Sequence, residues 1–297
     1  MSGRPGAHAV SLDRVLAGHR GLRLAGSLAD AVLDHFSGVV VNQDFAGQTA
    51  VVTAASRGIG RAIAHELLSR GASVTITARD AAALRSTADE LAVETGVERD
   101  RVLAVPGDAG DTESRAEAVK RTIEQFGSLD VLVNNAGINS LFGPLVDADL
   151  DEVRQTFDVN VTAALGFTQL AWHSWMSEHG GAIVNMSSTA ALRATGDIGV
   201  YGASKLALSR LTEELAYQLG PRVRVNAVAP AVVKTVFAEP LYSGREAEVV
   251  KRYPLGRLGI PSDVAKLVAF LASDAAGWIT GDTVRIDGGQ LVHSVIA

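Results

Sequence analysis

The sequence predicts one α/β domain, built on a doubly wound parallel sheet of about seven strands with helices on both faces. From Asp44 onward, short apolar segments rich in Val and Ile alternate with longer amphipathic segments. The first apolar segment also runs directly into a glycine-containing turn that a helix follows. Continuous apolar strands alternating with helices are typical of a parallel sheet that is buried on both faces. Right-handed crossovers then place a ligand crevice at the carboxyl ends of the strands.

The individual elements follow from the apolar runs and their spacing. Strands are predicted at Thr49–Thr53, Ser73–Thr77, Arg101–Pro106, Val131–Asn134, Ala182–Met186, Arg222–Val228 and Thr283–Ile286. Helices are predicted at Ile59–Arg70, Ala81–Thr95, Thr112–Phe126, Leu150–Ser177, Tyr201–Leu219 and Pro261–Ala272.

The first 43 residues differ in composition from the rest of the chain. We interpret 1–43 as a peripheral, poorly ordered extension and 44–297 as the folded domain. Short helices are predicted at 11–17 and 27–36, each after a serine that can cap it. The alternative is that the extension packs on the domain or on a neighbouring subunit.

Composition excludes several classes of function. The 297 residues are 20% charged with a net charge of −6, which disfavours a nucleic-acid partner, and 47% are hydrophobic, enough for a large core. The absence of cysteine excludes disulfides, thiolate catalysis and cysteine-ligated metals. The seven histidines are scattered, so we expect no metal site. Charged residues interrupt the most apolar early stretch, 22–41, so we expect no signal peptide, no membrane span and a cytoplasmic location.

The turn after the first strand has the features of a phosphate-binding loop. It reads Thr53-Ala54-Ala55-Ser56-Arg57-Gly58-Ile59-Gly60. Glycines allow the backbone to approach a pyrophosphate, and the following helix offers free N–H groups and a positive dipole end. The alternative is a plain strand-to-helix turn that uses glycine only for its geometry.

Together with other motifs, this turn resembles that of the short-chain dehydrogenase/reductase family, whose pattern is Thr-Gly-x-x-x-Gly-x-Gly. Thr53, Gly58 and Gly60 match, whereas Ala54 stands where the first glycine is expected. The tetrad Asn134-Asn135-Ala136-Gly137 after the fourth predicted strand matches without a change. The resemblance covers about 44–289 and implies a Rossmann fold and a nicotinamide cofactor. The most similar branch holds bacterial 3-oxoacyl thioester reductases and carbonyl reductases.

The end of the second predicted strand favours NADP(H), although NAD(H) is possible. Ala78 occupies the position where an NAD site commonly carries a carboxylate for the ribose hydroxyl. Arg79 follows at once, and Arg57 lies in the glycine turn, so two guanidinium groups can converge on a 2′-phosphate. A slip of one residue would instead make Asp80 the NAD-type carboxylate.

The start of the Tyr201–Leu219 helix carries the strongest catalytic signal. Tyr201 and Lys205 are four residues apart, so their side chains lie on one face of the helix. A nearby cation favours phenolate and lowers the ordinary tyrosine pKa of about 10. Tyr201 can then act as general acid in reduction and general base in oxidation. Taken alone, the pair would more often be an ordinary surface Tyr–Lys pair.

The resemblance implies further roles. Ser188, thirteen residues before Tyr201, matches the family serine that holds the substrate oxygen, with Ser187 as the alternative position. Asn160 matches an asparagine thought to support a proton relay, and as a core amide it can also bond the backbone. The predicted catalytic residues are therefore Asn160, Ser188, Tyr201 and Lys205. The predicted cofactor-binding residues are Thr53, Ser56, Arg57, Gly58, Ile59, Gly60, Arg79, Asp108, Ala109, Asn135, Ala136, Gly137, Tyr201, Lys205, Pro230, Val233 and Thr235. The family usually has glycine where Ala231 follows Pro230.

The predicted function is hydride transfer between NADP(H) and a carbonyl or secondary alcohol. The rival hypothesis is a catalytically silent protein that senses NADP(H) or acts as a scaffold. An apolar substrate wall is predicted from Leu141, Phe142, Leu192, Ile198, Phe237, Leu241, Tyr242 and Tyr253, which suits an acyl, cyclic or aromatic ketone. The resemblance also implies a homotetramer. No membrane or nucleic-acid partner is expected.

Overall fold

A seven-stranded parallel sheet forms the centre of the protein, as predicted. The computed structural model describes residues 43–292. The strands are β1 (Thr49–Val52), β2 (Ser73–Ala78), β3 (Val102–Pro106), β4 (Val131–Asn134), β5 (Gly181–Met186), β6 (Val223–Pro230) and β7 (Thr283–Ile286). Their order is β3-β2-β1-β4-β5-β6-β7, and every neighbouring pair is parallel. The chain turns back to the middle of the sheet after β3, so the switch point lies between β1 and β4, where α/β sheets bind their ligands.

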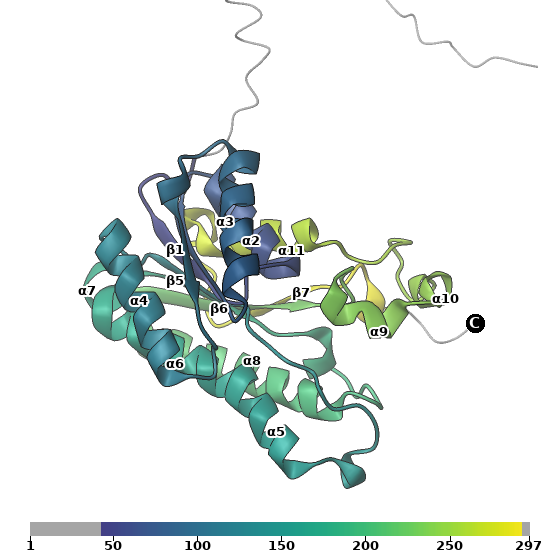
Figure 1. Ribbon diagram of the computed structural model, residues 1–297. Coiled ribbons are helices and arrows are strands. Elements are labelled where there is room, and N and C mark those ends of the chain that lie inside the picture. The colour runs from purple at the N-terminus through teal and green to yellow at the C-terminus, as the bar shows by residue number, and fades with distance from the viewer. Residues whose placement is uncertain (1–42, 293–297) are drawn as a thin grey trace, which may run out of the picture. The chain divides into compact units, whose positions relative to one another are not determined.

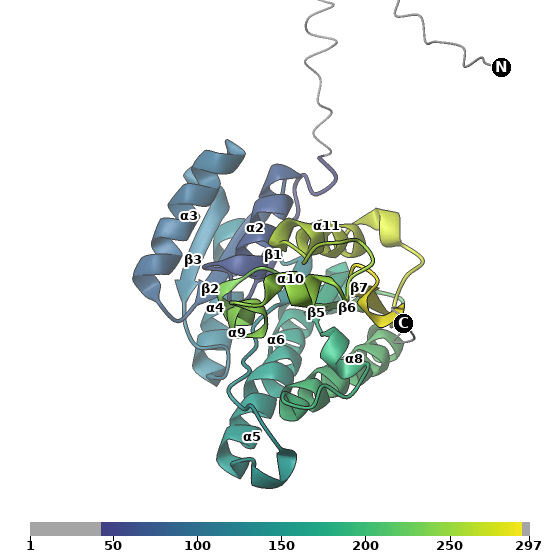
Figure 2. The ribbon, with the colours of Figure 1, turned by 90° about the vertical axis from the view of Figure 1, so that its right-hand side faces the viewer.

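Helices cover both faces of the sheet (Figures 1 and 2). One face carries α2 (Gly58–Ser69), α3 (Ala81–Thr95) and α11 (Pro261–Ala272), and the other carries α4 (Thr112–Phe126), α6 (Ala163–Ala171) and α8 (Gly199–Leu219). The smaller helices are α5 (Leu150–Phe157), α7 (Ser177–His179), α9 (Glu239–Tyr242) and α10 (Glu246–Val250). Each face has its own apolar core. Ile63 and Leu84 belong to the first core, and Val119 and Phe167 to the second.

The predicted long helix at 150–177 is helical throughout but not uniformly α. Two π-helical turns, Asp158–Thr162 and Trp172–Met176, separate α5, α6 and α7. The first π turn contains Asn160, whose buried side chain is hydrogen-bonded away from its own helix. The amphipathic pattern shows the helix, but it does not reveal these insertions because a single extra residue in a turn barely disturbs the periodicity.

The edges of other elements differ from the predictions by one or two residues. β6 continues to Pro230 because Ala229 and Pro230 still pair with Arg285 and Ile286 of β7. α8 begins at Gly199 rather than Tyr201. The helices predicted at 11–17 and 27–36 lie outside the described residues. Between residues 43 and 292, none of the helices combines the length and the apolar character that a membrane crossing requires.

Candidate active site

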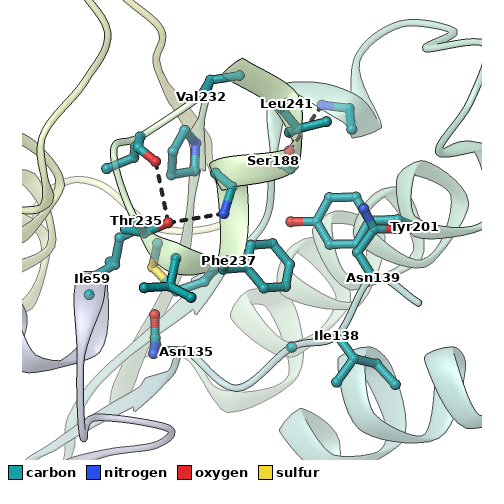
Figure 3. A pocket seen from close by; sticks show the side chains of 18 of the residues that line it. Ile59, Asn135, Ile138, Asn139, Ser188, Tyr201, Val232, Thr235, Phe237 and Leu241 are labelled. Atoms are coloured by element: carbon teal, nitrogen blue, oxygen red, sulfur yellow. Dashed lines mark hydrogen bonds between the residues drawn. The ribbon is translucent and has the colours of Figure 1, made fainter. Parts of the chain in front are cut away.

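A cavity of about 1420 Å³ opens at the carboxyl ends of the central strands. It is lined by the turn after β1, the tetrad after β4, the end of β5, the start of α8 and the segment after β6. Figure 3 shows part of this lining, with the hydroxyl of Tyr201 directed into the cavity and Ser188, Thr235 and Phe237 around it. The topology therefore brings predicted residues from five distant segments into one place.

The glycine turn fits a bound pyrophosphate. α2 begins at Gly58, and Arg57, which precedes it, makes no side-chain hydrogen bond to the helix end, so the first N–H groups remain available. Gly60 lies so close to its surroundings that a Cβ atom there would be 2.5 Å from Nδ2 of Asn135. Only glycine allows the turn to pack this tightly against the segment after β4.

Ala54 adopts a backbone conformation that favours glycine. Its φ is +51°, and it is the one non-glycine residue with positive φ within residues 43–292. The family pattern has glycine at this position, so the turn keeps its shape in spite of the substitution. The methyl group therefore costs the folded state about 1–2 kcal/mol at this position. Ala231, the other departure from a family glycine, carries no such strain.

Thr53 and Asn135 connect the glycine turn to β4. Oγ1 of Thr53 accepts hydrogen bonds of 2.9 Å from the backbone N–H groups of Asn135 and Ala136. Nδ2 of Asn135 donates to the carbonyl oxygens of Thr53 and Ala54. Thr53 is buried and does not line the cavity, so in this structure it supports the turn from behind. The hydrogen bonds that hold the loop occupy its hydroxyl oxygen.

The residues at the end of β2 all lie at the cavity. Ala78 is the last residue of β2 and lines the cavity together with Arg79 and Asp80. Asp80 is the N-cap of α3, and its Oδ1 accepts hydrogen bonds from Ala82 N–H and Ala83 N–H. The nearest carboxylate is therefore engaged in holding the helix end. Asp108 likewise accepts from Gly110 N–H while lining the cavity beside Ala109.

Ser188, Tyr201 and Lys205 converge on one side of the cavity. Ser188 caps the short 3₁₀ turn Thr189–Ala191, where its Oγ accepts from Ala190 N–H, and it lines the cavity together with Tyr201. Nζ of Lys205 donates to the carbonyl of Met186 at 2.7 Å and lies 5.7 Å from the centre of the Tyr201 ring. Ser187, the alternative serine, has its Oγ turned to Lys205 O and Ser209 Oγ. Both serines line the cavity, but the Ser187 hydroxyl is occupied within the fold, so Ser188 stays the predicted serine.

Burial changes the proton affinities of both side chains on α8. It raises the pKa of Tyr201 to about 12, and the neighbouring Ser188 hydroxyl opposes this rise. Burial lowers the pKa of Lys205 to about 8 because the ammonium loses its water. The sequence predicted a lowered tyrosine pKa, but in this structure desolvation dominates and the Lys205 ammonium is directed to a carbonyl. A cation closer to the phenol is needed to lower the pKa of Tyr201.

Asn160 is fully buried and supports the cavity wall from behind. Its Oδ1 accepts from Ile138 N–H at 2.8 Å, and its Nδ2 donates to Ile138 O and to Ser204 Oγ. Ile138 lines the cavity and Ser204 precedes Lys205, so Asn160 fixes the loop after β4 against α8. Asn160 itself does not line the cavity, which makes it a positioning residue.

The remaining predicted cofactor-binding residues also lie at the cavity. Ser56, Ile59, Gly137, Pro230, Val233 and Thr235 all line the cavity. A bridge between Val233 and Gly259 anchors the segment after β6. Oγ1 of Thr235 accepts from Ala238 N–H and so begins the segment that carries α9.

The predicted apolar wall is only partly confirmed. Phe142, Ile198, Phe237 and Leu241 line the cavity, and the Phe237 ring lies 6.1 Å from that of Tyr201. Leu141, Leu192, Tyr242 and Tyr253 do not line it. Tyr253, for example, is buried, and its hydroxyl accepts from Val232 N–H and Gln290 Nε2.

The sequence analysis missed the polar part of this wall. Arg193, Thr195, Asp197, Arg245, Glu248 and Arg252 line the cavity. The sequence does not predict that these residues after β5 and around α10 line a site, because isolated charged residues in loops more often face solvent.

The fold and cavity are those of a dinucleotide-binding α/β protein, and comparisons identify the family. The model of a family described as "Enoyl-(Acyl carrier protein) reductase" matches residues 53–290. "Dehydrogenase/reductase SDR family member 4" of Caenorhabditis elegans is 38% identical over 253 residues, 82% of this chain and 95% of the relative. "Trans-4-hydroxycyclohexanecarboxylate dehydrogenase" of Sinomonas cyclohexanicum is also 38% identical, over 84% of this chain and 95% of the relative.

Solved structures of similar fold are also found for this chain. A "blue fluorescent protein from metagenomic library in complex with NADPH" is 36% identical with a TM-score of 0.76, covering 83% of this chain and 99% of that one. A short-chain dehydrogenase/reductase from Brucella melitensis, titled "Glucose/ribitol dehydrogenase", is 32% identical with a TM-score of 0.77, covering 83% and 98%. The chain belongs to the short-chain dehydrogenase/reductase family, whose members are oxidoreductases that use nicotinamide cofactors. The comparisons give only loose support to the more specific resemblance to 3-oxoacyl thioester reductases.

Proposed function

We propose that this protein is an NADP(H)-dependent oxidoreductase that interconverts a carbonyl compound and a secondary alcohol, with Tyr201 as the general acid and base. The observation that carries the proposal is the convergence of Ser188, Tyr201 and Lys205 in the cavity that also contains the phosphate-binding turn. A nicotinamide cofactor bound there supplies or accepts the hydride.

The chain's own residues supply positioning and proton transfer. Ser188 donates a hydrogen bond to the substrate oxygen and holds it beside the phenol. Tyr201 then donates its proton to that oxygen in reduction, or removes it in oxidation. Lys205 is one helical turn away and would stabilise the phenolate form once its ammonium turns from Met186 O toward the phenol. Asn160 keeps the loop after β4 in register with α8.

The segment after β2 supports NADP(H) over NAD(H). Asp80 is occupied by the end of α3, and Arg57 and Arg79 line the cavity without an acidic partner within residues 43–292. A similar protein of known structure was solved with NADPH. The variant Arg79→Ala should therefore weaken NADPH binding by about tenfold, the value of one charge-assisted contact, and leave NADH binding nearly unchanged.

The test of the activity is NADPH consumption with a panel of ketones, comparing the native protein with Tyr201→Phe. We expect turnover of at least one class of ketone in the native protein and none in the variant, with the Kd for NADPH retained in both. Turnover that survives Tyr201→Phe would refute the assignment of the general acid. NADPH binding without turnover of any ketone would favour the rival function, a sensor of NADP(H).

A further inference from the structure

Three exposed arginines line the same cavity as Ser188 and Tyr201. Arg193 lies in the loop after β5, whereas Arg245 and Arg252 flank α10. The two segments are about fifty residues apart in the chain, and the fold brings them to one cavity. Arginine binds carboxylates and phosphates through two parallel hydrogen bonds, so such a group of side chains suits an anionic ligand.

These arginines have no acidic partner among the described residues 43–292, unlike other cations nearby. Lys234, on the same wall, pairs with Glu246 at 2.5 Å, and Arg257 pairs with Asp263 at 2.6 Å. The charges of Arg193 and Arg252 both lower the pKa of Tyr253, against the larger effect of burial, which places both guanidinium groups near that phenol. Asp197 and Glu248 line the cavity in the same two segments, so three arginines and two acidic residues line this part of it; the other charged residues of the lining belong to other segments.

A second observation also points to a polar ligand. Oδ1 of Asn139 and Oγ1 of Thr195 are buried, belong to residues that line the cavity, and have no hydrogen-bond partner within the described part of the chain. Their loops are joined by a hydrogen bond of 2.8 Å from Gly143 N–H to Asp197 O. Buried polar atoms without partners are costly, and at a binding site they are satisfied by the ligand.

From these two observations, and on the basis of the proposed function, we infer that the substrate is a carbonyl compound or alcohol that carries an anionic group, a carboxylate or a phosphate. The reacting oxygen is held by Ser188 and Tyr201. The anionic group is bound by Arg193, Arg245 and Arg252. Polar atoms of the substrate between its reacting oxygen and its anionic group form hydrogen bonds with Asn139 and Thr195. This proposal departs from the expectation of a mainly apolar substrate.

The test compares charged ketones with neutral partners of nearly equal shape. The carboxylate arm uses 4-oxopentanoate and 5-oxohexanoate beside their methyl esters, and the phosphate arm uses dihydroxyacetone phosphate beside dihydroxyacetone. NADPH consumption gives kcat/KM for each compound in the native protein, Arg193→Ala, Arg252→Ala and Lys251→Ala. Lys251 is the matched control, because it precedes Arg252 and is exposed but does not line the cavity.

We expect the anionic member of at least one arm to be preferred by about tenfold or more, since hydrogen bonds between charged groups are the strong ones. The preference should shrink toward unity in Arg193→Ala and Arg252→Ala, persist in Lys251→Ala, and weaken as salt is added. The arm that shows the preference distinguishes a carboxylate from a phosphate.

Two results would overturn the inference, and they differ in what they say of the proposed function. If neutral ketones are turned over as well as the anionic ones, and Tyr201→Phe abolishes that turnover, the anionic class is wrong while the proposed function stands. If nothing is turned over, the proposed function fails, and binding decides the inference. The anionic compounds should then raise the Tm of the NADPH-loaded native protein, and Arg252→Ala should abolish that increase. This result would support the inference, and no increase in the native protein would overturn it.

Discussion

At the scale of the residue, Ala54 stores strain that a single substitution should release. Its φ of +51° is costly for any side chain, whereas glycine adopts it freely. Ala54→Gly should raise the free energy of unfolding by about 0.5–1 kcal/mol, because the released strain exceeds the added entropy of the unfolded chain. Urea denaturation measures this change.

The neighbouring alanine provides the control. Ala55 is fully buried without positive φ, so Ala55→Gly should lower the free energy of unfolding by about 1 kcal/mol. If both variants were destabilised equally, the strain at Ala54 would be refuted.

Lys205 should lower the free energy of unfolding, although turnover requires it. Its pKa falls from 10.5 to about 8 on folding, so the buried ammonium opposes folding fully below pH 8, and the penalty disappears as the pH rises toward 10.5. At pH 7, Lys205→Met should raise the free energy of unfolding by up to about 3 kcal/mol while abolishing turnover. The lost hydrogen bond to Met186 O reduces this gain.

Denaturation at pH 7 and pH 9.5 tests the sign of the effect. The gain from Lys205→Met should be larger at pH 7 than at pH 9.5, and the exposed control Lys251→Met should show no such dependence. A variant that is less stable than the native protein at pH 7 would contradict the prediction.

At the scale of the element, the close packing of α8 against the turn that follows Ser188 fixes the positions of Tyr201 and Ser188 relative to each other. A Cβ atom at Gly202 would lie 2.6 Å from the carbonyl oxygen of Ala190, so Gly202→Ala must push the helix away from this turn. Because Tyr201 and Ser188 lie on the two sides of that contact, kcat/KM should fall by about a hundredfold. The Kd for NADPH should change much less, since the glycine turn is on another helix.

Steady-state kinetics and a fluorescence titration with NADPH separate these two effects. Ala203→Ser, on the exposed side of the same helical turn, should behave as the native protein. Unchanged kcat/KM in Gly202→Ala would show that the contact is not needed for the alignment of Ser188 and Tyr201.

The accuracy of the sequence analysis also varies by element. The strands and α2 were predictable because continuous apolar runs and the turn around Gly58 leave few alternatives. The spacing of Tyr201 and Lys205 predicts that both side chains lie on one face of α8, and both line the cavity, whereas their catalytic role stays a prediction. The π turn at Asn160 was not predictable, because one extra residue barely disturbs the apolar periodicity and the contact of Asn160 with Ile138 is made across the fold. The cavity arginines were not predicted either, because only the tertiary structure brings Arg193 and Arg252 to the same cavity.

At the scale of the whole molecule, exposed apolar side chains favour association with further copies of the chain. Leu206 and Tyr217 on α8 are 54% and 87% exposed, Leu150 on α5 is 65% exposed, and α5 contacts α8. Apolar side chains that recur on two adjacent helices are typical of a protein–protein interface. Light scattering should therefore give a mass that is a multiple of the monomer mass, with four copies expected from the family resemblance.

The variant Leu206→Glu tests whether this surface is the interface. A carboxylate buried between subunits without a partner is costly, so the variant should shift the mass toward the monomer at micromolar concentration. Val93→Glu is the control, because Val93 on α3 is 84% exposed on the opposite face of the sheet. Since α8 carries Tyr201 and Lys205 at its start, loss of association should also lower kcat. A native protein that scatters as a monomer would remove this surface as an interface and leave the active site complete within one chain.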